Sequence, residues 1–184
     1  MPTSRTREEQ IKTIKDIFVS LMWIAARQFS HRLQAFGLTH PQFIVLVSLA
    51  AHKQACTMRD LTNVTFQDPP TMTGIIDRLV RMKLVQRTRS ESDRRVVLVE
   101  ATSAGMELVK RVKEESMQED IRGYTAFSDD DLSALEQSLR YLLRMYVGQF
   151  ASLQGAELDA EIEKLQNFSH DPIRYMKSKD EKVS

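Results

Sequence analysis

The sequence feature that most constrains the fold is a change in the spacing of apolar residues near position 84. Up to that point, apolar residues recur every three or four positions, as they do along one face of a helix. Residues 84–89 and 95–100 instead follow the two-residue period of strands, and the polar segment 90–94 between them predicts a hairpin tip. Helical spacing then returns, so the fold class is mainly α with one small β-hairpin.

Capping residues predict where the helices begin and end. A helix over residues 8–35 has no internal proline and ends near Gly37, which suits the position after the last turn. Thr39, Thr57 and Asp68 are suited to cap the next three helices, and Pro69 fits a first helical position. After the hairpin, further helices are expected from Thr102 or Ser103 to about Tyr124, from Ser128 with Asp131 in a capping box, and over 156–167.

Length and composition exclude several classes of protein. The chain has 184 residues, which corresponds to one domain or one domain with an appendage. Its single cysteine, Cys56, excludes a disulfide within the chain and any all-cysteine metal site. No apolar run has the length of a membrane span, and the first residues lack the apolar core of a signal peptide. We therefore expect a cytoplasmic protein with no membrane partner.

Charge is distributed unevenly along the chain. The segment from Lys53 to Arg95 contains nine basic and five acidic residues, so its net charge is +4. The segment from Glu114 to Lys164 contains four basic and twelve acidic residues, so its net charge is −8. A basic middle segment favours a polyanion partner, although a chance fluctuation on a solvated surface gives the same pattern.

Three short helices followed by a two-stranded hairpin is the order of a winged helix-turn-helix. The helix that begins at Pro69 would enter the major groove, and Thr71 and Thr73 near its start are short residues able to hydrogen-bond base edges. Arg94 and Arg95 at the hairpin tip supply cations for phosphates or a narrow minor groove. The order of elements thus favours a protein that binds double-stranded DNA.

Six short motifs in this order resemble the MarR family of transcriptional regulators. They are LTHPQF (38–43), MRDL (58–61), TMT with IDRL (71–79), KLVQR (83–87), DRR (93–95) and TSAG (102–105). The resemblance implies a bacterial homodimer, most often a repressor, in which the first helix and the last two form the dimerisation part. It also implies that Asp93 holds Arg95 by an ion pair while arginine reaches the minor groove.

The resemblance divides the chain into four expected parts. They are an N-terminal dimerisation helix (1–37), a winged helix-turn-helix lobe (38–101), dimerisation helices (102–150) and a C-terminal extension (151–184) with a short amphipathic helix and a flexible tail. Twofold symmetry predicts a pseudo-palindromic operator with half-sites about 10 bp apart. The candidate DNA-binding residues are Thr71, Thr73, Gly74, Asp77, Arg78, Arg81, Arg89, Asp93, Arg94 and Arg95.

Gly74 departs from the family pattern, which often has a basic or larger residue there. Glycine inside a helix costs ~1 kcal/mol relative to alanine, so it either admits a close approach to DNA or alters base readout. Together with a net charge of only +1, it also motivates an alternative, a winged-helix protein–protein interaction module that does not bind DNA.

Trp23, Arg27 and His31 recur every four residues on one side of the first helix. Members of the MarR family often bind small aromatic or phenolic anions, and an aromatic wall beside a cation suits such an effector. The alternative is that Trp23 packs in the core and Arg27 lies on the surface, which is the commoner arrangement for these residue types.

No sequence motif predicts catalysis, a cofactor or a metal. The chain lacks G-x-S-x-G, H-E-x-x-H and P-loop patterns, so we expect no enzyme and no catalytic residues. His52 and Cys56 are four residues apart, but two ligands do not make a metal site. Cys56 is interpreted as a small buried apolar residue rather than a redox switch.

Overall fold

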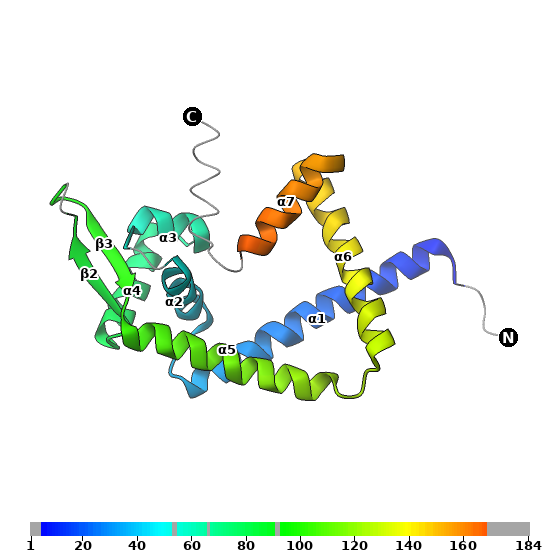
Figure 1. Ribbon diagram of the computed structural model, residues 1–184, viewed down its shortest axis with the longest axis horizontal. Coiled ribbons are helices and arrows are strands. Elements are labelled where there is room, and N and C mark those ends of the chain that lie inside the picture. Colours follow the sequence, from blue (N-terminus) through cyan, green and yellow to red (C-terminus); the bar gives the residue numbers. More distant parts are fainter. Residues whose placement is uncertain (1–4, 53–54, 66, 91–92, 169–184) are drawn as a thin grey trace. The chain divides into compact units, whose positions relative to one another are not determined.

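The computed structural model describes residues 5–52, 55–65, 67–90 and 93–168 (Figure 1). The chain falls into two compact units, Met1–Phe43 and Ile44–Ser184, and each is described by itself. Lys53, the hairpin-tip residues Glu91 and Ser92, and the expected flexible tail beyond residue 168 lie outside the described residues.

The first unit is dominated by helix α1 (Arg7–Ala35), which agrees with the predicted helix to within one residue. Its start is a full capping box, in which the Thr6 hydroxyl accepts from the Glu9 N–H and the Glu9 carboxylate accepts from the Thr6 N–H. Helix α1 ends at Phe36, and Gly37 adopts the left-handed backbone conformation predicted for it (φ 69°).

Helix α2 (His40–His52) carries the chain from the first unit into the second. The side chain of Gln42 accepts a hydrogen bond from the Thr39 N–H at 2.8 Å, which fixes the helix start. In the first unit, the ring of Phe29 packs edge-on against Phe43 and His40, with centroid distances of 5.3 and 5.7 Å.

The second unit holds the predicted lobe, with α3 (Met58–Thr65), α4 (Pro69–Arg81), β2 (Val85–Arg89) and β3 (Val97–Ala101). Strands β2 and β3 pair antiparallel as the predicted hairpin. A third strand that was not predicted, β1 (Cys56–Thr57), pairs with the other edge of β3 in the order β1-β3-β2. A two-residue strand is too short for its period to be recognised.

One core joins α2, α3, α4 and the sheet. Its fully buried side chains come from every one of these elements, and they are Leu46, Leu49, Leu61, Met72, Ile76, Leu79, Val85 and Val99. Cys56 is also buried, as interpreted from the sequence, and its thiol lies 3.7 Å from the Val99 carbonyl oxygen. Helix α4 and the β2–β3 hairpin are therefore mounted on a single packed body.

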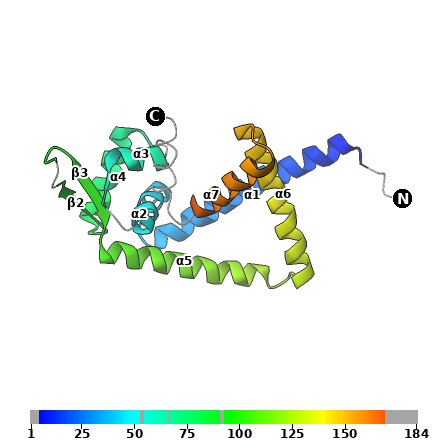
Figure 2. The same cartoon turned by 45° about the horizontal axis from the view of Figure 1, so that its top comes forward.

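Among the described residues, three helices follow the wing: α5 (Ser103–Tyr124), α6 (Asp129–Ala151) and α7 (Gly155–Phe168). Thr102 caps α5, and Ser128 with Asp131 forms the predicted capping box of α6. Helix α7 returns from the C-terminal end of α6, as Figures 1 and 2 both show. An ion pair between Arg144 and Asp159 joins α6 to α7.

Candidate nucleic-acid interface

The start of α4 is fixed by its cap, Asp68. Its carboxylate accepts from the Thr71 N–H at 2.9 Å and from the Thr71 hydroxyl at 2.7 Å. The hydroxyl hydrogen bond, followed by the backbone one, lowers the pKa of Asp68 below its ordinary value. The cap thus carries a negative charge at neutral pH and complements the positive end of the helix.

Both threonine hydroxyls on α4 have their hydrogen engaged. Thr71 donates to Asp68, and Thr73 donates to the Pro69 carbonyl at 3.0 Å. A hydroxyl that donates inside the protein still offers its lone pairs as acceptors, and threonine also presents a methyl group. These two side chains are suited to accept from exocyclic amines of adenine or cytosine and to contact a thymine methyl.

The outward face of α4 contains most of the predicted major-groove residues. Thr71, Thr73, Gly74, Arg78 and Arg81 are all exposed. A Cβ atom at Gly74 would meet nothing within 4 Å in the protein, so no packing inside the chain requires a glycine there. Asp77 differs from these residues, because its carboxylate lies 2.6 Å from Arg87 Nη2 on strand β2.

The tip of the wing is a tight turn at Asp93. The Val96 N–H donates to the Asp93 carbonyl, and the Arg95 N–H donates to the Asp93 carboxylate, both at 2.9 Å. This is the local hydrogen-bonding pattern by which aspartate stabilises a turn. Asp93 therefore holds Arg95 through the backbone, and the described residues include no ion pair between the two side chains, in contrast to the expected one.

Three cations project from the wing. Arg89, Arg94 and Arg95 are exposed. The turn at Asp93 positions the last two side by side, while Arg89 stands at the outer end of β2. The structure thus brings the predicted wing residues together at one end of the hairpin.

A close junction joins the recognition helix to α5. Lys83 adopts a left-handed conformation (φ 60°) just after α4, and the Thr102 hydroxyl donates to the Lys83 carbonyl at 2.8 Å. The same hydroxyl accepts from the Gly105 N–H at 3.1 Å. A Cβ on Gly105 would lie 2.1 Å from the Leu84 carbonyl oxygen, so only glycine fits there.

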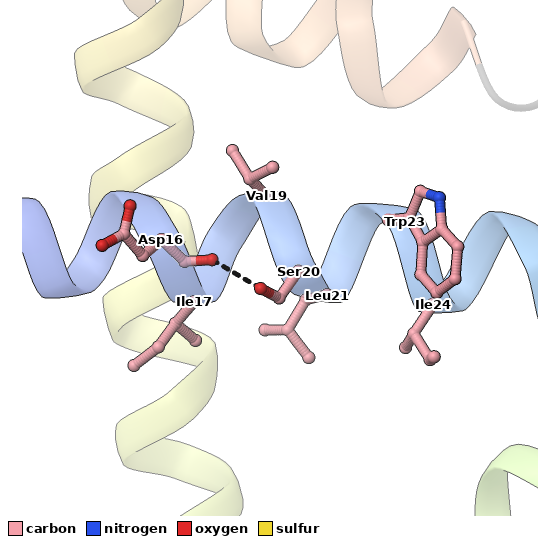
Figure 3. Close-up of a pocket in the computed structure, with 7 residues that line it drawn as sticks. All are labelled: Asp16, Ile17, Val19, Ser20, Leu21, Trp23 and Ile24. Atoms are coloured by element: carbon pink, nitrogen blue, oxygen red, sulfur yellow. Dashed lines mark hydrogen bonds between the residues drawn. The ribbon is translucent and has the colours of Figure 1, made fainter.

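The candidate effector residues lie on α1 in the first unit. The Arg27 guanidinium lies over the Trp23 ring at 5.4 Å, and the ring is 60% exposed, so Trp23 is not a core residue of this chain. Trp23 also lines an open hollow of about 810 Å³, whereas Arg27 and the exposed His31 do not (Figure 3). The lining residues all come from α1, and they are Asp16, Ile17, Val19, Ser20, Leu21, Trp23 and Ile24.

The described ranges were predicted to hold neither a metal site nor a membrane span. No group of three or more histidine, cysteine, aspartate or glutamate side chains within them is placed to hold a metal ion. In the same part of the chain, no single helix is long and apolar enough to cross a membrane, and α1 with α2 passes that test only as a bent pair.

Comparisons with known proteins point to the same class of protein as the geometry. A sequence model of the MarR family matches residues 36–96, which span α2 to the wing. The chain is 30% identical over 117 residues to the organic hydroperoxide resistance transcriptional regulator of Bacillus subtilis (strain 168), covering 64% of this chain and 78% of that protein.

Two further matches agree. The chain is 33% identical over 111 residues to the HTH-type transcriptional repressor NicR of Pseudomonas putida KT2440, covering 60% of this chain and 66% of that protein. Its fold matches the crystal structure of wild-type MarR from E. coli with a TM-score of 0.62 at 25% identity, covering 70% of this chain and 95% of that chain. The two sequence relatives are transcriptional regulators.

Proposed function

Because the chain belongs to the MarR family of winged helix-turn-helix transcriptional regulators, we propose that it is a bacterial repressor that binds a pseudo-palindromic operator as a homodimer. One observation carries this proposal: the threonine side chains near the start of α4 and the arginines of the wing are all exposed. Short acceptor side chains on the helix suit base edges in the major groove, and arginines at the hairpin tip suit the minor groove.

MarR regulators bind DNA operators as dimers. In this chain we assign the dimer contacts to residues 1–37 and 102–150, since α1 and α6 carry large apolar side chains that the chain leaves exposed. Ile14 and Leu21 on α1 are 51% and 59% exposed, and Leu139 on α6 is 52% exposed. A second copy would remove these surfaces from water, which is the main favourable term in association.

Operator release by a small aromatic or phenolic anion is the second part of the proposal. The stacked pair of Trp23 and Arg27 offers an aromatic surface beside a cation, and the adjoining hollow on α1 is mostly apolar. The two DNA-binding lobes of a dimer can adopt different spacings. A ligand that binds one of these arrangements more tightly would shift the dimer towards it and so change the operator affinity. The regulator would act in the cytoplasm, at the nucleoid.

The test begins with selection of bound duplexes from a random library. We expect the wild-type protein to enrich a twofold-symmetric motif and to bind it as a dimer in sedimentation. Arg95→Ala should weaken binding of that duplex by about tenfold or more and make it less dependent on salt, because a wing cation is lost.

Lys164→Ala is the control, since this lysine pairs with Glu161 on α7, outside both the lobe and the assigned dimer contacts. It should leave the affinity for the selected duplex unchanged. Unchanged binding by Arg95→Ala would refute the wing assignment, and a well-folded dimer that enriches no duplex would favour the protein-interaction module instead.

A further inference from the structure

Strand β2 presents three side chains on one face, one buried and two exposed. Alternate residues of a strand share a face, so Val85, Arg87 and Arg89 lie in a row. Val85 is buried (2% exposed), the Arg87 side chain is 35% exposed, and Arg89 is exposed. Arg87 therefore stands where the sheet leaves the core, next to the buried Val99 with which it is in register.

The partner of Arg87 comes from the recognition helix. Its Nη2 atom lies 2.6 Å from the Asp77 carboxylate, and the Asp77 side chain is 49% exposed. Asp77 is the acidic residue inside α4, on a helix proposed to face DNA phosphates. A free carboxylate there would repel the phosphates, and pairing with Arg87 neutralises both charges.

This ion pair supplies a second connection between α4 and the wing. The first is the turn at the end of α4, where the Lys83 N–H donates to Val80 and the Leu84 N–H donates to Leu79. Arg87 lies two residues, about 7 Å, beyond Val85 along the strand, and Asp77 lies about one turn before the helix end. The shared core holds α4 and β2 together inside the lobe, and the ion pair adds a polar connection between them at the exposed edge of that core.

We propose that Asp77 and Arg87 are positioning residues that set the angle between recognition helix and wing, and that neither binds a phosphate. The phosphate-binding cation of this strand is then Arg89, one step further out on the same face. This inference rests on the proposed DNA-binding function, and it gives Asp77 a different role from the direct DNA contact expected at the outset.

The experiment measures Kd over a range of salt concentrations for the duplex that the wild-type protein selects. Asp77→Asn and Arg87→Gln should each weaken binding by about tenfold, because the two reading elements lose their mutual angle. The double variant should bind no more weakly than either single variant, because the pair acts as a unit. The slope of log K against log salt should match that of the wild type in the double variant, from which both charges of the pair have been removed.

Arg89→Gln is the contrasting variant, and it should reduce that slope by about 1. The matched control is Gln86→Ala, which breaks the hydrogen bond to Glu100 (2.7 Å) on the opposite face of the sheet. We expect this variant to bind as the wild type does. All variants should keep the wild-type melting temperature to within a few degrees, because a half-exposed pair contributes little to stability.

Two results would overturn the inference while leaving the proposed function intact. One is a slope reduced as much in the double variant as in Arg89→Gln, which would make Arg87 a phosphate contact. The other is additive losses in the double variant, which would show that the two residues act separately. Failure of the wild-type protein to enrich any duplex would instead contradict the proposed function, and the inference would fall with it.

Discussion

Helices α4 and α6 have similar apolar patterns, but only α4 buries its apolar face within the chain. Helix α4 has 13 residues and buries Met72, Ile75, Ile76 and Leu79. Helix α6 has 23 residues, all described, and buries none. Periodic spacing indicates that a face is apolar, but it does not say whether the same chain covers that face. The lobe buries its apolar core within one chain, whereas the apolar face of α6 stays exposed.

The exposed stripe of α6 is left open even by the helix that packs on it. Leu139, Leu143, Tyr146 and Phe150 are spaced by four, three and four residues, which places them on one face, and they are 40–95% exposed. Helix α7 contacts α6 instead through Arg144 and Gly148, roughly half a turn of the helix away. The α6–α7 pair therefore leaves the stripe available to a second copy, as proposed.

The strongest test of this contrast compares one leucine from each helix. Leu79→Ala removes a side chain that is 0% exposed, and we expect the free energy of unfolding to fall by about 2–5 kcal/mol. Leu139→Ala removes one that is 52% exposed, and we expect it to weaken the dimer instead. Urea unfolding at several protein concentrations separates the two effects.

For Leu79→Ala, the loss should be the same at every concentration, because it occurs within one chain. For Leu139→Ala, the unfolding midpoint should drop most at low concentration, and sedimentation should show more monomer. A Leu139→Ala protein that remains as dimeric as the wild type at all concentrations would break the contrast, since Leu139 would then contribute nothing to the contact with a second copy.

Two glycines of the second unit allow a tightly packed position to be compared with an open one. Gly105→Ala places a Cβ 2.1 Å from the Leu84 carbonyl oxygen, and we expect a loss of about 3 kcal/mol from this backbone clash. Gly74→Ala meets nothing within 4 Å on the exposed face of α4, and we expect a gain of up to about 1 kcal/mol. Thermal unfolding of both variants measures the opposite signs.

The DNA affinity of Gly74→Ala adds a second readout. If the glycine admits a close approach of the helix backbone to DNA, the stabilised variant should bind the selected duplex more weakly. Equal stability losses for the two glycine variants would contradict the open environment of Gly74.

The sequence predicted the helix boundaries well because the caps act locally. Asp68, Thr102 and Ser128 bond to groups three residues away, so their role is visible in a short window of sequence. Strand β1 was missed because its two residues pair with Val99 and Leu98, more than forty positions away. Non-local pairing of so short a segment leaves no period to detect.

The candidate site was predictable to a similar degree. Exposure of Thr71, Thr73 and Arg78 follows from helical spacing alone, and exposed arginines at a hairpin tip follow from its polarity. Asp77 and Arg87 are ten residues apart and lie in two different elements, α4 and β2. The only sequence signal for their pairing was the place of Arg87 on the same strand face as Val85. Trp23 shows the limit most clearly, because four-residue spacing places it on a face without saying whether that face is covered.

The smallest expected effect concerns the acidic residues that fix the starts of the same two helices, the N-cap Asp68 of α4 and the capping-box residue Asp131 of α6. Hydrogen bonds from Thr71 and from Ser128, respectively, lower the pKa of each carboxyl. A lowered pKa in the folded state means that each carboxylate stabilises the fold above about pH 4, and that this contribution is lost as the pH falls from there through the folded-state pKa. Asp68→Asn keeps a capping side chain and removes the titration, so urea unfolding of this variant should lose less stability between about pH 5 and pH 3 than the wild type does. Asp131→Asn should reduce the acid loss in the same direction, and it should do so most clearly at protein concentrations where the dimer holds α6 in place. An acid loss identical to that of the wild type in both variants would show that neither cap contributes to the pH dependence of folding.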